Sequence, residues 1–462
     1  MEVAMSTESS TEKVRSSSPM WQFLTSPTEK MKEKAVELLN MVVKIGRDDP
    51  RRILHSIKVG LALTLVSVFY YVNPLFNGFG TSAMWAVLTV VVVMEFTVGG
   101  TLGKGLNRTF ATLLAGALGL GAHYVAVLGG ERGEPILLGI FVFILAAAAT
   151  FSRFVPEIKA RYDYGVTITI LTFSLVAVSS YRVEEMIQMA HQRLSTIALG
   201  VAACLVTSMF VFPVWAGEDL HKLTAANLDK LASFFEGLGA QYFEEKMGSG
   251  NLDGSSFLQV HKSVLNSKAT EDSLANFARW EPGHGKFSFR HPWTQYLKIG
   301  AHSRQCAYSL EALAVYITTS DKSQASRDTE LHQRIRSACA EMSRESGKAL
   351  AELASAIRNM TSPPASASHH VANALVAAGK LKHAMPAGDL QDAVVPLHDV
   401  LRLATSASLL AQVVTSTHQI AASVNELAQA ARFKKPEPTH KATIKPVADG
   451  ESPPHVTIDI VL

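Results

Sequence analysis

Cysteine is scarce in this chain, and that scarcity argues against a small secreted protein held together by disulfides. Only three cysteines occur among the 462 residues, and none stands in a CxxC or other metal-ligand spacing. They indicate reduced thiols rather than the disulfide framework that stabilises small secreted domains. The Ser-rich N-terminus "STESSTEKVRSSSP" lacks an apolar h-region, so the sequence predicts no cleaved secretory signal.

Excess charge and catalytic motifs are also lacking. The formal net charge is only +3, which gives no support for a nucleic-acid partner. The sequence contains no GxSxG, HExxH or P-loop motif. The glycines of "GTLGKG" are preceded by no strand and open an apolar run, which is the wrong context for a phosphate loop. The sequence therefore predicts neither an enzyme nor a bound cofactor.

Long apolar runs dominate the first half of the chain. Residues 59–94 carry no charge at all. A membrane-crossing helix needs about 20 residues, so that run is too long for one crossing, and "NPLFNGFG" divides it into two. The whole pattern predicts six membrane spans, near residues 53–72, 82–98, 101–127, 135–151, 163–180 and 191–216.

Shifts in composition divide the chain into four parts. Residues 1–46 form a polar arm with an amphipathic helix, and residues 47–217 form a six-helix transmembrane domain. Residues 218–434 have apolar positions at helical spacing and predict a cytosolic helical domain, in which "WEPGHGKFSFRHPW" forms a structured loop. Residues 435–462 are Pro-rich and predict a disordered tail. The expected fold class is an all-α membrane protein.

The distribution of Lys and Arg predicts the orientation in the membrane. Basic residues gather in "KIGRDDPRR" before the first span and in "SRFVPEIKAR" between the fourth and fifth spans. Cytosolic flanks carry such an excess. Because the number of predicted spans is even, both termini are expected in the cytosol.

Cations at the ends of two spans are the main functional signal. In "TLGKGLNRTF", Lys104 and Arg108 lie four residues apart and share one helix face, and Arg193 opens the sixth span. The alternative for each cation is that its side chain snorkels to the lipid headgroups. This alternative fits Arg108 least, because Arg108 lies about 10 Å into its span. Glu95 could neutralise one of them. Unpaired cations that face a bundle interior attract anions, so these residues predict an anion pathway.

Two acidic residues predict a second kind of site. Glu184 and Glu185 lie in the short link "YRVEEMIQ", on the predicted outer side of the membrane. Carboxylate oxygens suit hard, multiply charged cations, so the pair is a candidate metal site. A solvated turn is the alternative interpretation.

Several stretches, taken in order, resemble the plant aluminium-activated malate transporter family. They include "DPRRILHSIKVGLAL", "MWAVLTVVVVMEFTVGGTLGKGLNR", "RYDYGVTITILTF" and "WEPGHGKFSFRHPW", and the likeness runs from about residue 44 to about residue 434. The resemblance implies a homodimeric, dicarboxylate-permeable anion channel in membrane lipid. The implied channel passes malate, and in some members of the family external aluminium ions activate the channel. Similarity in the spans favours a plasma-membrane member, with the vacuolar membrane as the alternative.

The resemblance also implies roles for individual residues. Lys104, Arg108 and Arg193 match pore-lining basic positions of the family, and Glu184 matches an outer acidic position tied to aluminium. Acidic positions of the cytosolic domain that affect transport are matched by Glu271, Asp272 and Glu281. The segment "FVF", which contains Phe210 and Phe212, resembles one linked to inhibition by gamma-aminobutyrate; packing in the core or against lipid is the alternative for these rings. The first outer loop has no acid and Gln188 replaces a second carboxylate, so the aluminium site departs from the family pattern.

Two other functions compete with a channel. An ion-coupled secondary carrier of dicarboxylates would need carboxylates inside the membrane and internal repeats, whereas Glu95 is the only acid well inside a span-like run. A membrane-tethered signalling scaffold would leave the basic positions unexplained. The sequence favours the channel.

Overall fold

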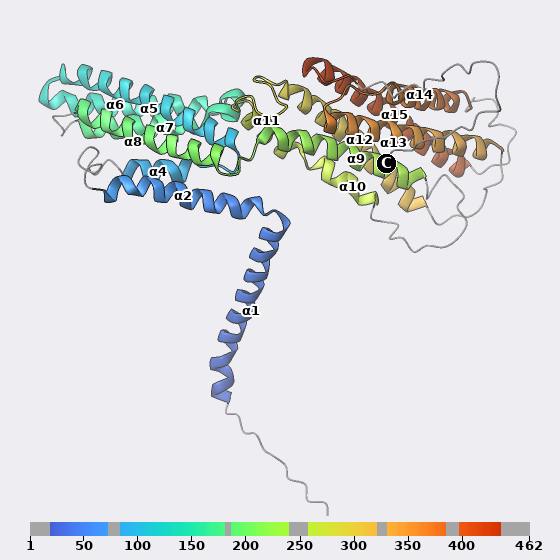
Figure 1. Ribbon diagram of the computed structural model, residues 1–462, viewed down its shortest axis with the longest axis horizontal. Helices are drawn as coiled ribbons and strands as arrows, with labels where there is room; N and C mark the ends of the chain where they lie inside the picture. The colour runs from blue at the N-terminus through green and yellow to red at the C-terminus, as the bar shows by residue number, and fades with distance from the viewer. Residues whose placement is uncertain are drawn as a thin grey trace, which may run out of the picture. The chain divides into compact units, whose positions relative to one another are not determined.

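The computed structural model describes residues 19–72, 84–180, 186–239, 257–320, 330–384 and 397–435. Throughout these ranges the regular structure is helical, and extended pairing is limited to two isolated bridges (Figure 1). The predicted all-helical class is therefore confirmed for the part of the chain described. The break "NPLFNGFG" lies outside these residues.

The chain divides into two compact units. Unit 1 comprises residues 1–219 together with 273–290, and unit 2 comprises residues 220–272 together with 291–462. Residues 273–290, which we call the 273–290 segment, therefore pack with the apolar first half of the chain although they follow part of the soluble-looking half.

Unit 1 is built mainly from the apolar helices. Its helices are α1 (Pro19–Asp48), α2 (Arg51–Tyr71), α4 (Met84–Val93), α5 (Val98–Val127), α6 (Gly130–Ser152), α7 (Pro156–Ser180) and α8 (Met186–Phe210). Among the described residues, α5, α6, α7 and α8 are long and apolar enough to cross a membrane, and α4 is a shorter apolar helix. Four of the six predicted spans are thus present as such helices.

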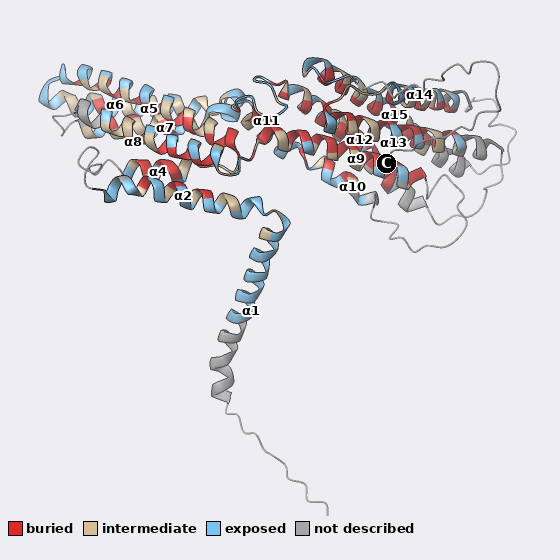
Figure 2. Ribbon diagram, in the orientation of Figure 1, coloured by how far each residue is buried: buried red, intermediate tan, exposed pale blue. Residues whose placement is uncertain are grey.

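The outer surface of these helices is apolar. In α6 most side chains are exposed, as Figure 2 shows, and they include Phe143, which is 74% exposed. In water an apolar surface of this kind would drive aggregation. It suits hydrocarbon, where helices satisfy all their backbone hydrogen bonds internally. The structure therefore fits a membrane protein.

Glycines allow close packing along α5. A Cβ atom on Gly99 would collide with the carbonyl oxygen of Phe277, and one on Gly103 would lie 2.8 Å from Cδ1 of Trp280. Further along the helix, a Cβ on Gly119 would lie 2.6 Å from Val176 of α7. Small residues commonly mediate close helix packing in membranes. Gly99 and Gly103 thus allow the 273–290 segment to lie against α5.

We expect Gly99→Ala to destabilise the protein. The added methyl group meets backbone atoms that cannot rotate away, and overpacking of this kind costs about 1–3 kcal/mol. The matched control is Gly121→Ala in the same helix, where nothing lies within 4 Å of an added Cβ. Thermal unfolding of the detergent-solubilised protein should shift down by several degrees for Gly99→Ala alone. Equal unfolding temperatures for the two variants would contradict the close packing.

Unit 2 is a bundle of amphipathic helices. It contains most of α9 (Ala216–Leu238) and the start of α11 (Lys268–Ala278), together with α10 (Phe257–Leu265), α12 (Trp293–Ser320), α13 (Glu330–Asn359), α14 (Ala365–Ala384) and α15 (Leu397–Ala430). Pairs such as α12 with α15 and α13 with α14 pack along their lengths. Side chains such as Leu228, Phe234 and Leu310 are fully buried in its core.

Candidate functional site

Arg108 is buried in α5, and no carboxylate of the described residues pairs with it. Its side chain is only 3% exposed. Nη1 donates a hydrogen bond to the hydroxyl of Tyr164 on α7 at 3.2 Å, whereas the buried Nε has no acceptor among the described residues. Burying an unpaired cation is costly. Its burial argues against snorkelling and leaves a guanidinium available to an anion.

Arg108 and Arg193 line the same cavity. This cavity has a volume of about 370 Å³ and is walled mostly by apolar side chains of α5, α7 and α8. The guanidinium of Arg193 lies 5.0 Å from the ring centroid of Trp85, which supports it by a cation–π contact. His191 also lines the cavity. The two cations can bind an anion in this cavity, and the low dielectric of its apolar walls strengthens the electrostatic attraction.

Lys104 has a different environment from Arg108. Its ammonium group forms an ion pair with the carboxylate of Glu95 and lies 5.7 Å from the ring centroid of Tyr164. Glu95 therefore neutralises Lys104, whereas no ion pair of Arg108 or Arg193 occurs among the described residues. Lys104 does not line the cavity that Arg108 and Arg193 share.

Glu281 holds the 273–290 segment to the start of α9. Its buried carboxylate accepts hydrogen bonds from the backbone N–H groups of Ala216 at 2.6 Å and Gly217 at 3.0 Å. These groups have no partner within the helix, and the positive end of the helix dipole favours an anion there. Burial raises the pKa of the Glu281 carboxyl, and these hydrogen bonds oppose that effect. Glu281 thus acts as a helix cap.

Glu271 and Asp272 lie in unlike surroundings. Glu271 is buried and forms an ion pair with Arg304 of α12, while Ser267 Oγ at 2.7 Å and Asn227 Nδ2 at 3.2 Å donate to it. Asp272 is exposed. The two neighbouring carboxylates therefore do not form one site in this structure.

The predicted phenylalanines lie at the end of α8, whose last residue is Phe210. Phe210 is 80% exposed and Phe212 is 66% exposed, which fits contact with lipid better than burial in a core. The backbone carbonyl of Phe212 accepts a hydrogen bond from Nζ of buried Lys58 at 2.7 Å. Sequence reasoning counted Lys58 only among the basic residues that flank the first span, and it did not single out Tyr164.

The candidate metal residues cannot be placed. Glu184 and Glu185 lie outside the described residues, between 180 and 186. Within the described ranges, no group of three or more His, Cys, Asp or Glu side chains is arranged to hold a metal ion.

Comparisons of the amino-acid sequence with known proteins match one family over most of the chain. Residues 43–393 match the family described as aluminium activated malate transporter. The chain is 55% identical to aluminum-activated malate transporter 1 of Triticum aestivum over 419 residues, which cover 89% of this chain and 90% of the relative. It is 49% identical to aluminum-activated malate transporter 2 of Arabidopsis thaliana, with 89% of this chain and 82% of the relative covered.

Proposed function

This chain belongs to the aluminium-activated malate transporter family, and we propose that it is an anion channel that releases malate across a membrane. The observation that carries the proposal is the cavity that Arg108 and Arg193 share, with no carboxylate paired to Arg108 in the described part of the chain. Bidentate hydrogen bonds from a guanidinium group match a carboxylate in geometry and charge.

Malate carries two negative charges near neutral pH, so it loses much hydration on entering a membrane. One cation at 4 Å offsets this by about 4 kcal/mol per unit charge at an effective dielectric of 20. In a two-fold homodimer, which we include in the proposal, each arginine would occur twice. Several wet sites of moderate strength allow the anion both to enter and to leave.

The membrane topology is part of the proposal. Here α2 and α4 supply the first two spans, α5 to α8 supply the other four, and unit 2 and both termini lie in the cytosol. The basic flanks of the apolar runs support this orientation. We include the plasma membrane in the proposal, because the resemblance in the apolar spans favours it.

Channel conduction can be separated from coupled transport by reversal potentials. In voltage-clamped oocytes, a tenfold change in the malate gradient should shift the reversal potential by about 30 mV, since two charges each gain about 2.3 kcal/mol per 100 mV. Dependence of the shift on a proton gradient instead would favour the carrier. The pairing of Glu95 with Lys104 already removes one candidate coupling carboxylate.

External aluminium is proposed to activate the current through the outer acids. If Glu184 binds the ion, Glu184→Gln should weaken activation and leave the basal current unchanged, because an amide oxygen carries no charge for a hard cation. Glu131→Gln, which removes an exposed acidic side chain of α6, is the matched control for a nonspecific effect of charge loss. Full activation of the Glu184→Gln channel at the same dose would identify a solvated turn.

A further inference from the structure

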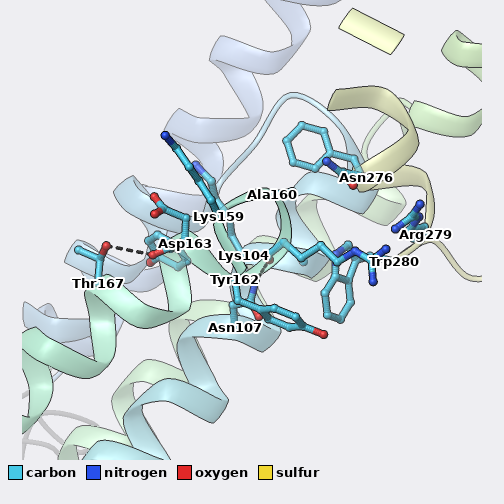
Figure 3. A pocket seen from close by; sticks show the side chains of 14 residues that line it. Lys104, Asn107, Lys159, Ala160, Tyr162, Asp163, Thr167, Asn276, Arg279 and Trp280 are labelled. Atoms are coloured by element: carbon cyan, nitrogen blue, oxygen red, sulfur yellow. Dashed lines mark hydrogen bonds between the residues drawn. The ribbon is translucent and has the colours of Figure 1, made fainter. Parts of the chain in front are cut away.

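Unit 1 contains a second cavity, separate from the one that Arg108 lines. It has a volume of about 590 Å³, within the range of small-molecule sites. Its walls come from α5, from the first turns of α7 and from residues 276–280. Figure 3 shows Asn276, Arg279 and Trp280 along one side of it, and Lys159, Asp163 and Thr167 along the other.

Positive charge dominates the lining of this cavity. The basic side chains are Lys104, Lys159, Arg161 and Arg279. The one acidic side chain of the lining, Asp163, is bound bidentately by Arg153 at 2.6 and 3.1 Å. Among the described residues, no carboxylate is ion-paired with Lys159, Arg161 or Arg279. The cavity therefore has a surplus of cations.

Two of these cations repel one another. Burial and the positive charge of Arg161 both lower the pKa of the Arg279 guanidinium. Other contacts hold the backbone at these two residues. Asn107 Nδ2 donates to the carbonyl oxygen of Arg161 at 3.1 Å, and Trp280, next to Arg279, packs against Gly103. Like charges held together in a rigid frame are stabilised when an anion lies between them.

A hydrogen bond connects the linings of the two cavities. Tyr164 lines the second cavity, and its hydroxyl accepts the hydrogen bond of Arg108, which lines the first. Tyr164 and Arg108 are therefore the side chains that lie between the two cavities. This adjacency connects the second cavity with the proposed pathway.

We propose that the second cavity is a binding site for small dicarboxylates, in which Arg161 and Arg279 each pair with one carboxylate group. This inference rests on the proposed function, because it treats the site as the loading position for the conducting cavity. Two guanidinium forks match a molecule that carries two carboxylates better than a monovalent anion. Arg279 thus gives the 273–290 segment a direct role in selecting the anion.

The test in membrane patches is the double variant Arg161→Gln/Arg279→Gln. The malate concentration that gives half-maximal current should rise about tenfold or more, because each variant residue loses a charge-assisted hydrogen bond to a carboxylate. The maximal current should remain, since Arg108 is intact. Lys286→Gln is the matched control, an exposed charge of the same segment that does not line the cavity. An unchanged half-saturating concentration in the double variant overturns the inference and leaves the proposed channel function standing.

A binding measurement separates this inference from conduction. In purified full-length protein, malate should change the fluorescence of Trp280, one of five tryptophans. The change should disappear in Trp280→Phe and in the double variant, and it should be much weaker with acetate than with malate. A malate signal that persists in the double variant refutes the assignment whether or not the protein conducts.

Discussion

Arg108→Ala should abolish most of the malate current, reducing it at least tenfold at every malate concentration. The structure gives the reason, because the guanidinium is buried, faces a cavity and has no carboxylate partner in the described part of the chain. Without it, an anion in the cavity would lose a contact of about 4 kcal/mol per unit charge at an effective dielectric of 20. A tenfold loss corresponds to only about 1.4 kcal/mol, so the estimate leaves a wide margin.

Milder substitutions should reduce the malate current less, each according to the interaction that it removes. Arg108→Lys should keep part of the current, because the charge remains but the planar fork is lost. Tyr164→Phe should have a smaller effect than Arg108→Ala, since it removes only the acceptor that orients Nη1. Lys104→Ala should also have a smaller effect, because Glu95 already neutralises that ammonium group. Its effect should shrink in high salt, where the Debye length falls to about 3 Å at 1 M.

The comparison requires equal amounts of protein at the cell surface. Surface biotinylation measures that amount, and Arg132→Ala, which removes an exposed arginine of α6 remote from the cavity lining, is the matched control. Normal malate currents from surface-expressed Arg108→Ala and Arg193→Ala channels would together contradict the anion site.

The local sequence pattern predicted a continuous helix through Lys104 and Arg108. The four-residue spacing of Lys104 and Arg108 placed them on one face, and α5 does form a continuous helix there. That Arg108 and Arg193 line one cavity follows from the packing of α5 with α8, which the sequence suggested only through their shared charge. The distinction between paired Lys104 and unpaired Arg108 was not predictable, because it depends on where the Glu95 side chain points.

Contacts between remote segments were beyond sequence reasoning. The Pro and Gly residues of "WEPGHGKFSFRHPW" correctly predicted an irregular segment, but composition placed it in the soluble half. Its packing in unit 1 depends on Gly99 and Gly103 and on the capping of α9 by Glu281. Each of these contacts joins residues more than 60 positions apart, so no local periodicity records them.

The resemblance grouped Glu271 with Asp272 and Glu281 as acidic positions that affect transport. In the structure, Glu271 is part of a buried network in unit 2, with Arg304, Ser267 and Asn227 as its partners. A Cβ atom on Gly300 would collide with its carboxylate, so the surrounding helices fit this side chain closely. These contacts suggest that Glu271 acts by stabilising unit 2 rather than by sensing an ion.

We therefore expect Glu271→Leu to destabilise unit 2 by about 3–5 kcal/mol, because it leaves the guanidinium of Arg304 buried without its partner. The double variant Glu271→Leu/Arg304→Met should recover most of that loss, since an apolar pair can replace a buried ion pair. Asp272→Asn, at an exposed neighbour, should stay within about 0.5 kcal/mol of the unsubstituted protein. Thermal unfolding of the purified full-length protein, followed by the loss of helical circular dichroism, measures all three.

Currents recorded from the same variants distinguish stabilisation from sensing. If Glu271 only stabilises the fold, the double variant should regain both surface expression and malate current per channel. A double variant that folds and reaches the surface but conducts no malate would show that the carboxylate itself takes part in transport. Arg304→Met alone should also lower stability, because it leaves the Glu271 carboxylate buried with only neutral hydrogen-bond donors. Since Asn227 and Ser267 continue to donate to that carboxylate, the loss should be smaller than for Glu271→Leu.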